Sequence, residues 1–150
     1  MIPGQHSGES SDSNTNITLL GFDYGSKRIG VAVGQTLLQS ATPLTSLLYS
    51  NHKPDWNGVT RLVAEWQPAE LVVGLPFDLD DTESEVAGKA KRFARQLHGR
   101  YRLPVHMIDE RLTSREAASI LQTQDKSDGR LDAMAAALIL ETWLRSSSAT

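Results

Sequence analysis

Two apolar runs joined by a short turn near the start of the chain constrain the fold most. Ile17–Asp23 and Arg28–Gly34 are rich in β-branched and other apolar residues, and a Gly-Ser pair lies between them. Such runs around a glycine-containing turn predict a β-hairpin. The first run ends in an acid, Asp23, although a strand that is only buried has no use for a carboxylate. Two interpretations stay open: Asp23 closes the turn as an Asx-turn residue, or it has a chemical role.

The rest of the chain alternates between strand-like and helical patterns. Ala41–Leu48 is a weaker third strand, and Pro43 within it indicates a sheet edge or a strand start. Next we expect a helix that Pro54-Asp55 opens and that ends before Pro68, and then a buried strand in "AELVVGLP". An amphipathic helix Thr82–His98 and a strand Pro104–Glu110 come after them. The chain ends with a helix from the capping box Thr113–Glu116 through Leu121 and a last helix from about Leu131 to Leu144. This order predicts an α/β fold of the ribonuclease H-like type. Three antiparallel strands continue into right-handed βαβ units, which makes a mixed five-stranded sheet with helices on both faces.

Length and composition limit what the chain can be. With 150 residues it should form one domain. We expect a disordered tail over residues 1–16, a folded domain over 17–145 and a frayed end over 146–150. Cysteine is absent, which excludes disulfides and thiolate zinc sites and favours a reducing, cytoplasmic compartment. The longest apolar run, Ala133–Leu140, is too short to cross a membrane. The net charge of −3 means that any nucleic-acid-binding surface must be local.

Carboxylates recur where elements end. Asp23 ends the first strand, Asp109 and Glu110 end the last strand, and Asp132 lies in the first turn of the last helix. If the first and last strands are neighbours, these acids can approach one another. Alternation along a strand puts Asp109 and Glu110 on opposite faces, so only one of them should face such a site.

Acids gathered in this way require protons or a cation between them. Two carboxylates about 4 Å apart repel by about 4 kcal/mol at an effective dielectric constant of about 20. A set of oxygen ligands suits Mg²⁺ or Mn²⁺, and one or two such ions can activate water for phosphodiester hydrolysis. The alternatives are structural: Asp132 can be a helix N-terminal acid, and Asp109-Glu110-Arg111 a solvated strand end. Likewise, Lys89, Lys91, Arg92 and Arg95 on the outer half of the 82–98 helix indicate either a solvated face or a nucleic-acid contact.

Together, these segments resemble the YqgF family, also called RuvX-like proteins, which are pre-16S rRNA nucleases related to Holliday-junction resolvases. The resemblance runs from about Leu19 to Leu144 and rests on "GFDYGSKRIGVAVG", "PDW", "EWQPAELVVGLPFDLDDTE", "HMIDERLTS" and "LDAMAAALILE". It implies a cytoplasmic, metal-dependent nuclease that processes the 5′ end of 16S rRNA precursor, free or on the ribosome, with one or two Mg²⁺ or Mn²⁺ ions.

The resemblance also implies residue roles. Asp23, Glu110 and Asp132 would be the catalytic and metal-binding acids, with Asp109 as the alternative to Glu110. Gly25, Lys27, Arg28 and Arg111 would contact nucleic acid. The loop "QTQDKSDGRL" before the last helix is shorter than is usual in the family, which leaves contacts by Lys126 or Arg130 open. Two other functions stay open: a Holliday-junction-type DNA endonuclease, and a catalytically idle nucleic-acid or ribosome-binding module.

Overall fold

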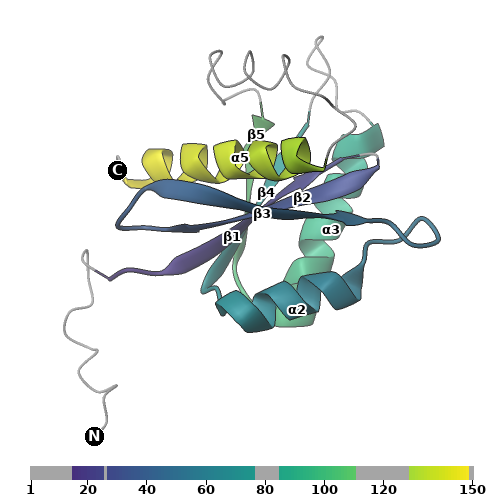
Figure 1. Ribbon diagram of the computed structural model, residues 1–150, viewed down its shortest axis with the longest axis horizontal. Helices are drawn as coiled ribbons and strands as arrows, with labels where there is room; N and C mark the ends of the chain where they lie inside the picture. The colour runs from purple at the N-terminus through teal and green to yellow at the C-terminus, as the bar shows by residue number, and fades with distance from the viewer. Residues whose placement is uncertain (1–14, 26, 77–84, 111–128, 149–150) are drawn as a thin grey trace, which may run out of the picture.

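The computed structural model describes residues 15–25, 27–76, 85–110 and 129–148, which contain a five-stranded sheet (Figure 1). The strand order is β3-β2-β1-β4-β5. β1 pairs antiparallel with β2 and parallel with β4, β2 pairs antiparallel with β3, and β4 pairs parallel with β5. The strands are β1 Thr18–Tyr24, β2 Arg28–Gln35, β3 Ser40–Leu48, β4 Glu70–Leu75 and β5 Val105–Asp109. The predicted mixed sheet is therefore confirmed.

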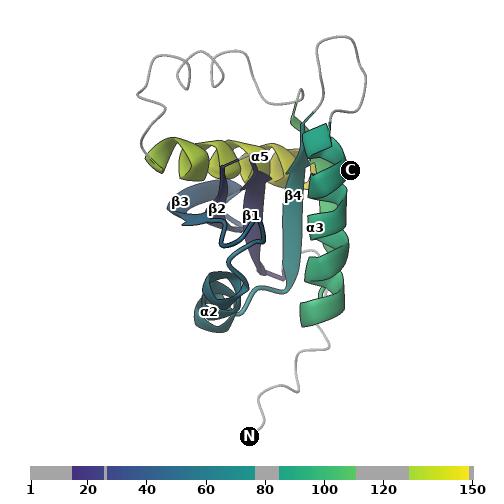
Figure 2. The ribbon, with the colours of Figure 1, turned by 90° about the vertical axis from the view of Figure 1, so that its right-hand side faces the viewer.

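Helices cover both faces of the sheet (Figures 1 and 2). α2 (Trp56–Trp66) and α3 (Glu85–Tyr101) lie on one face, and α5 (Arg130–Ser148) lies on the other. Asp55 caps α2 by accepting a hydrogen bond of 3.0 Å from the Gly58 amide. The larger core lies between the sheet and α2 with α3, where Phe22 packs edge-to-face on Phe93. Burial on both sides explains why β1 and β4 are almost wholly apolar.

The face under α5 is built from small residues, which brings this helix unusually close to the strands. A Cβ atom at Gly21 would lie 2.8 Å from the Leu140 Cβ atom, and one at Gly34 would lie 3.1 Å from a Leu140 methyl group. Ala32 packs against Ala136 in the same layer. Larger side chains, among them Leu19 and Ile108, fill the rest of this interface. The close approach is thus local to the glycines and Ala32, and it lets the first turn of α5 lie directly on the sheet.

Several predicted boundaries shift. β3 lies at the sheet edge as Pro43 indicated, and the β2–β3 register shifts between Val31 and Ala32. The predicted helix through Leu121 and residues 1–14 lie outside the described residues. Asn16, placed in the tail by sequence, instead accepts a hydrogen bond of 3.1 Å from the Leu37 amide. α5 continues to Ser148, beyond its expected end, and the Thr142 and Ser146 hydroxyls donate to carbonyl oxygens four residues earlier.

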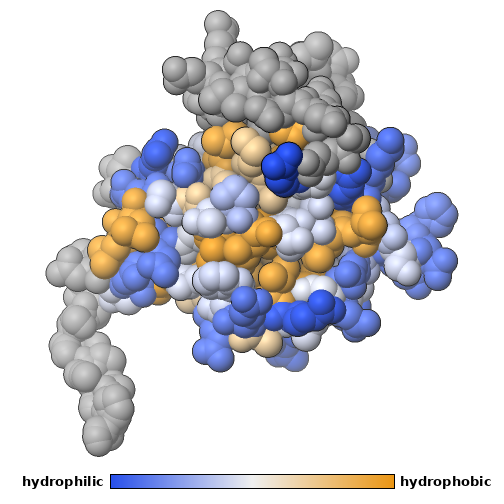
Figure 3. All heavy atoms as spheres, viewed as in Figure 1, coloured by the Kyte–Doolittle hydropathy of each residue, from blue (hydrophilic) through white to orange (hydrophobic). Residues whose placement is uncertain are grey.

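The surface along the β3 edge carries apolar side chains, visible in Figure 3. Leu37 and Leu38, which precede β3, and Leu48, its last residue, are each more than half exposed. Within the described ranges, none of the helices has the length and apolarity needed to cross a membrane.

Candidate active site

The three acids predicted from the sequence come from three different elements. Asp23 lies near the end of β1, Glu110 follows β5 directly, and Asp132 lies in the first turn of α5. The condition considered for this approach, that the first and last strands are neighbours, is not met, because β4 lies between β1 and β5. The acids nevertheless meet, since Asp23 interacts electrostatically with both Glu110 and Asp132.

Gly74 on the intervening strand makes this approach possible. It lies opposite Asp23 on β1 and opposite Ile108 on β5. A Cβ atom at Gly74 would lie 3.1 Å from the Glu110 Oε2 atom and 2.4 Å from the Ile139 Cδ1 atom. The space that a side chain would fill is thus where Glu110 reaches across β4 toward Asp23. The Glu110 Oε2 atom is buried there.

Gly30 has the matching role on the other side of Asp23. It is the partner of Asp23 in the β1–β2 ladder. A Cβ atom at Gly30 would lie only 1.9 Å from the Asp132 carbonyl oxygen, so any side chain would push α5 away from the sheet. Sequence reasoning missed both Gly30 and Gly74. The available signal was a glycine inside an otherwise apolar strand, which marks close approach by another part of the chain.

The register decides which acid of the Asp109-Glu110 pair faces Asp23. Asp109 is opposite Leu75, whose side chain packs in the core under α2 and α3. The preceding residue, Ile108, packs on the opposite side, against α5. Because strand side chains alternate, Glu110 follows the direction of Ile108 and lies on the same face as Asp23.

The carboxyl groups of Asp23 and Glu110 influence one another's pKa. Burial raises the pKa of Asp23 well above its ordinary value, and the charges of Glu110 and Asp132 raise it further. Burial also raises the pKa of Glu110, as does the charge of Asp109, against the lowering effect of the hydrogen bond from Asp23. A carboxylate can only accept, so a hydrogen bond between two carboxyl groups requires one proton, and the raised pKa of Asp23 favours Asp23 as the group that holds it.

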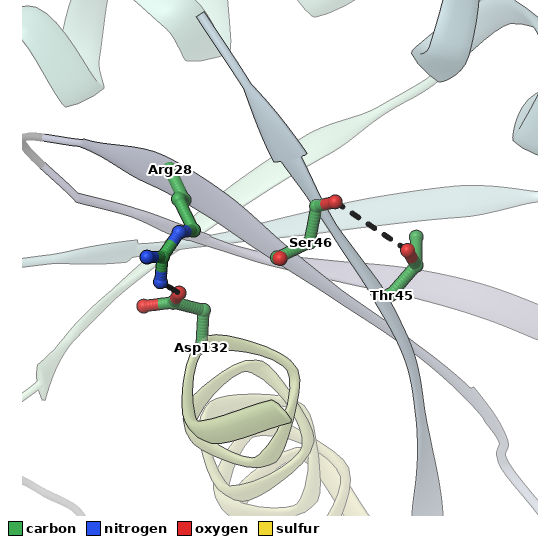
Figure 4. Close-up of polar contacts among 4 residues, drawn as sticks. All are labelled: Arg28, Thr45, Ser46 and Asp132. Carbon is green, nitrogen blue, oxygen red and sulfur yellow. Dashed lines mark hydrogen bonds and ion pairs between the residues drawn. The ribbon is translucent and has the colours of Figure 1, made fainter. Parts of the chain in front are cut away.

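Asp132 is turned toward a cation. Figure 4 shows the Arg28 side chain extending from β2 to the Asp132 carboxylate on α5, with Nη1 and Oδ2 3.3 Å apart. Burial raises the pKa of Asp132, and Arg28 partly offsets the rise. The residue before α5 also lies close to β3, because a Cβ atom at Gly129 would lie 2.3 Å from the Ser46 hydroxyl oxygen.

The turn after Asp23 is closed by its own hydrogen bonds. The Gly25 amide donates to the Arg28 carbonyl oxygen at 3.0 Å, and the Tyr49 hydroxyl donates to the Gly25 carbonyl oxygen. A Cβ atom at Gly25 would lie 2.9 Å from the Arg28 carbonyl oxygen, so closure of the hairpin by itself requires glycine here. Of the other predicted nucleic-acid contacts, Lys27 is exposed on this turn, and Arg111 lies outside the described residues.

The donor set fits a hard divalent cation. All three side chains offer carboxylate oxygens, the ligands that Mg²⁺ and Mn²⁺ prefer, and a cation between Asp23 and Glu110 would replace the proton that they share. Across the described part of the chain, however, no three acids or histidines are already grouped as metal ligands. The third carboxylate, Asp132, is instead paired with Arg28.

Known proteins share both the sequence and the fold. The sequence model of the RuvX family, described as "Holliday junction resolvase", matches residues 17–146. A protein of Azotobacter vinelandii named "Putative pre-16S rRNA nuclease" is 53% identical over 130 residues, which cover 84% of this chain and 92% of that protein. A protein of Pseudomonas putida with the same name is 50% identical over 135 residues, covering 87% and 96%.

Solved structures of resolvases have the same fold at low identity. The structure of Thermus thermophilus RuvC matches with a TM-score of 0.53 and 16% identity, over 87% of this chain and 97% of that one. The yeast mitochondrial Holliday junction resolvase Ydc2 matches with a TM-score of 0.53 and 13% identity, over 87% and 78%. This likeness confirms the ribonuclease H-like architecture that the element order predicted.

Proposed function

The chain belongs to the RuvX family and is a nuclease, and from this premise we propose that it hydrolyses phosphodiester bonds at the 5′ end of 16S rRNA precursor. Its family implies a nucleic-acid substrate and dependence on divalent metal. The choice of RNA rests on relatives at 44–53% identity that are named as pre-16S rRNA nucleases. We place the reaction in the cytoplasm, where bacterial ribosomes are assembled, with the precursor free or on the ribosome.

The observation that carries the proposal is the approach of Glu110 to Asp23 through the space left by Gly74. Burying two like-charged groups together costs stability, which a chain without a use for them would not retain. In our proposal Asp23 and Glu110 are catalytic ligands of one or two Mg²⁺ or Mn²⁺ ions, and Asp132 is the third. When bound, such ions activate water and stabilise the charge on the leaving oxygen.

Arg28 connects the third acid to the substrate. Its guanidinium group lies 3.3 Å from the Asp132 carboxylate. A phosphate group competes for the same donors, because arginine binds phosphate and carboxylate oxygens with the same geometry. We therefore assign Arg28, with Lys27 on the exposed turn and Arg111, to substrate phosphates. Arrival of substrate would then release Asp132 toward the other two acids.

Cleavage of a 16S precursor 5′-leader RNA tests the proposal. Wild type should cut this RNA with Mn²⁺ or Mg²⁺ and not in EDTA, and Asp23→Asn should cut at least about a hundredfold more slowly, since a ligand is lost. Glu65→Gln on the exposed side of α2 removes the same charge away from the acids and should cut like wild type. Equal cutting by wild type and Asp23→Asn would contradict the assignment of the acids.

A DNA substrate is the second candidate because the family description names Holliday junctions. A four-way DNA junction in the same assay separates the two. Preferential cutting of the junction would make the chain a DNA endonuclease with the same acids. Metal-independent RNA binding without any cutting, equal in Asp23→Asn, would instead identify an idle binding module.

A further inference from the structure

α3 carries a concentration of positive charge that the acid cluster does not use. Its seventeen residues include five lysines and arginines, at positions 89, 91, 92, 95 and 100, against the single acid Glu85. The whole chain has a net charge of −3, so this helix opposes the overall balance. A local basic face on an acidic protein is the electrostatic feature expected of a polyanion-binding surface.

Two of these basic residues lack a compensating acid within the described chain. Lys89 forms an ion pair with Glu85, with Nζ and Oε2 3.8 Å apart. The Arg100 guanidinium group stacks over the Trp56 ring, 4.0 Å from its centroid. Arg92 and Arg95 are exposed, and neither forms an ion pair with another residue in the described ranges. Their charges are therefore available to a partner outside the chain.

Arg92 and Arg95 lie in the middle of the solvent-facing stripe of α3. Positions 88, 92, 95 and 99 are spaced by four, three and four residues, so they line up along one side of a helix. The opposite side is buried against the sheet and consists of Ala87, Ala90, Phe93, Ala94 and Leu97. The stripe therefore faces directly away from the protein.

The two ends of this stripe are glycines that packing does not explain. A Cβ atom at Gly88 or at Gly99 would meet no described atom within 4 Å. Glycine inside a helix lowers its stability relative to alanine, so each of these positions weakens α3 without a structural gain within the described chain. Glycine also allows another backbone to approach closely, which is consistent with a ligand lying along the helix.

α3 begins at the same end of the sheet as the acids, on the face opposite to theirs. β4 and β5 are parallel, so α3, which connects them, runs back along the sheet and begins at the end where β4 finishes beside Asp23 (Figure 2). We propose that the outer face of α3, formed by Gly88, Arg92, Arg95 and Gly99, binds the phosphate backbone of the RNA substrate outside the active site. This inference rests on the proposed function, because it takes RNA as the substrate.

Binding without cleavage tests the surface separately from the chemistry. The probe is a fluorescently labelled 16S precursor 5′-leader RNA in EDTA, titrated by anisotropy at several salt concentrations. Arg92→Gln/Arg95→Gln should raise Kd about tenfold or more and make the salt dependence shallower by about 1.4 in log–log slope, about 0.7 for each phosphate that an arginine no longer neutralises. The control is Lys53→Gln/Arg61→Gln, which removes two exposed charges outside α3 and should leave Kd and slope near wild type.

A second variant excludes misfolding as the cause. Gly88→Ala/Gly99→Ala should raise Tm because alanine favours helix, and should nevertheless weaken RNA binding severalfold because the added methyl groups hinder close approach. Unchanged Kd and slope in the arginine variant, or an equal loss in the control, would overturn the proposal. The proposal would also be overturned if the arginine variant lost affinity for a four-way DNA junction but kept its affinity for RNA.

The outcomes also separate this inference from the proposed function. The arginine variant should cut saturating RNA at the wild-type rate, whereas Asp23→Asn should bind RNA and fail to cut it. If wild type does not cut this RNA, the proposed function fails, while the binding comparison still decides the role of α3.

Discussion

Replacing Asp23 with asparagine should stabilise the metal-free protein, although it removes the residue central to the site. Asp23 and Glu110 hold one proton between them because burial and mutual repulsion raise the pKa of Asp23. An asparagine amide has nearly the same shape, donates to Glu110 as the protonated acid does, and carries no charge that must be neutralised. The variant should therefore keep a hydrogen bond to Glu110 without the free-energy cost of keeping Asp23 protonated at neutral pH.

The size of the effect follows from the repulsion. Two carboxylates about 4 Å apart repel by about 4 kcal/mol at an effective dielectric constant of about 20. The native pair avoids part of this by retaining a proton that the unfolded chain would release at neutral pH. We expect about half of that figure, a gain of about 2 kcal/mol in the free energy of unfolding at pH 7. For a domain of this size the gain corresponds to a rise in Tm of about 6 °C.

The pH dependence gives the sign of the effect. Because the pKa of Asp23 is raised in the native state, the native protein holds a proton that the unfolded chain has lost above its ordinary pKa of 3.8. Wild-type stability therefore falls as the pH rises from that value through the native pKa. Asp23→Asn lacks this loss, so its advantage should be absent below about pH 4 and should grow toward neutral pH.

Thermal and urea unfolding in EDTA from pH 3.5 to 7.5 provide the assay. Glu65→Gln is the control and should change stability by less than about 0.5 kcal/mol. Adding Mn²⁺ should raise the Tm of wild type more than that of Asp23→Asn. Lower stability of the variant at pH 7 in EDTA, or a difference that does not vary with pH, would refute the account of the acid pair.

Three further changes test the surroundings of the acids. Gly30→Ala should destabilise the protein by about 3 kcal/mol in urea unfolding, because its Cβ atom would lie 1.9 Å from the Asp132 carbonyl oxygen. A free energy of unfolding equal to that of wild type would show that α5 does not lie tightly against β2. Arg28→Gln should change stability by less than about 1 kcal/mol, since the ion pair is partly exposed. It should also raise the pKa of Asp132 further, which carboxyl NMR titration measures, and an unchanged titration would argue against the pairing. Tyr49→Phe should cost about 1 kcal/mol by removing the donor to the Gly25 carbonyl oxygen, and denaturation at pH 7 measures the loss.

Much of the architecture was predictable because it depends on local patterns. Strand-like runs around a short glycine turn predicted the hairpin, Pro43 indicated an edge strand, and Asp55 indicated a helix start. Each of these features reflects hydrogen bonding or burial within a few residues. The alternation of Asp109 and Glu110 across a strand indicated that only one of them would face the other acids.

The site itself was only partly accessible in this way. Sequence singled out Asp23, Glu110 and Asp132 as candidates, and Asp23 interacts electrostatically with the other two. The condition considered for their approach, contact between the first and last strands, is not met, because β4 lies between them. Pattern reasoning also had no means to pair Arg28 with Asp132, which are 104 residues apart.

The chain by itself thus determined the order of strands and helices and which residue types stand at their ends, because neighbouring residues set backbone geometry and burial. Tertiary structure alone decided that Asp23 meets Glu110 across β4 and that Asp132 lies against β2. Each approach depends on the space left by a third residue, Gly74 in one case and Gly30 in the other. Such space exists only once distant segments have packed together.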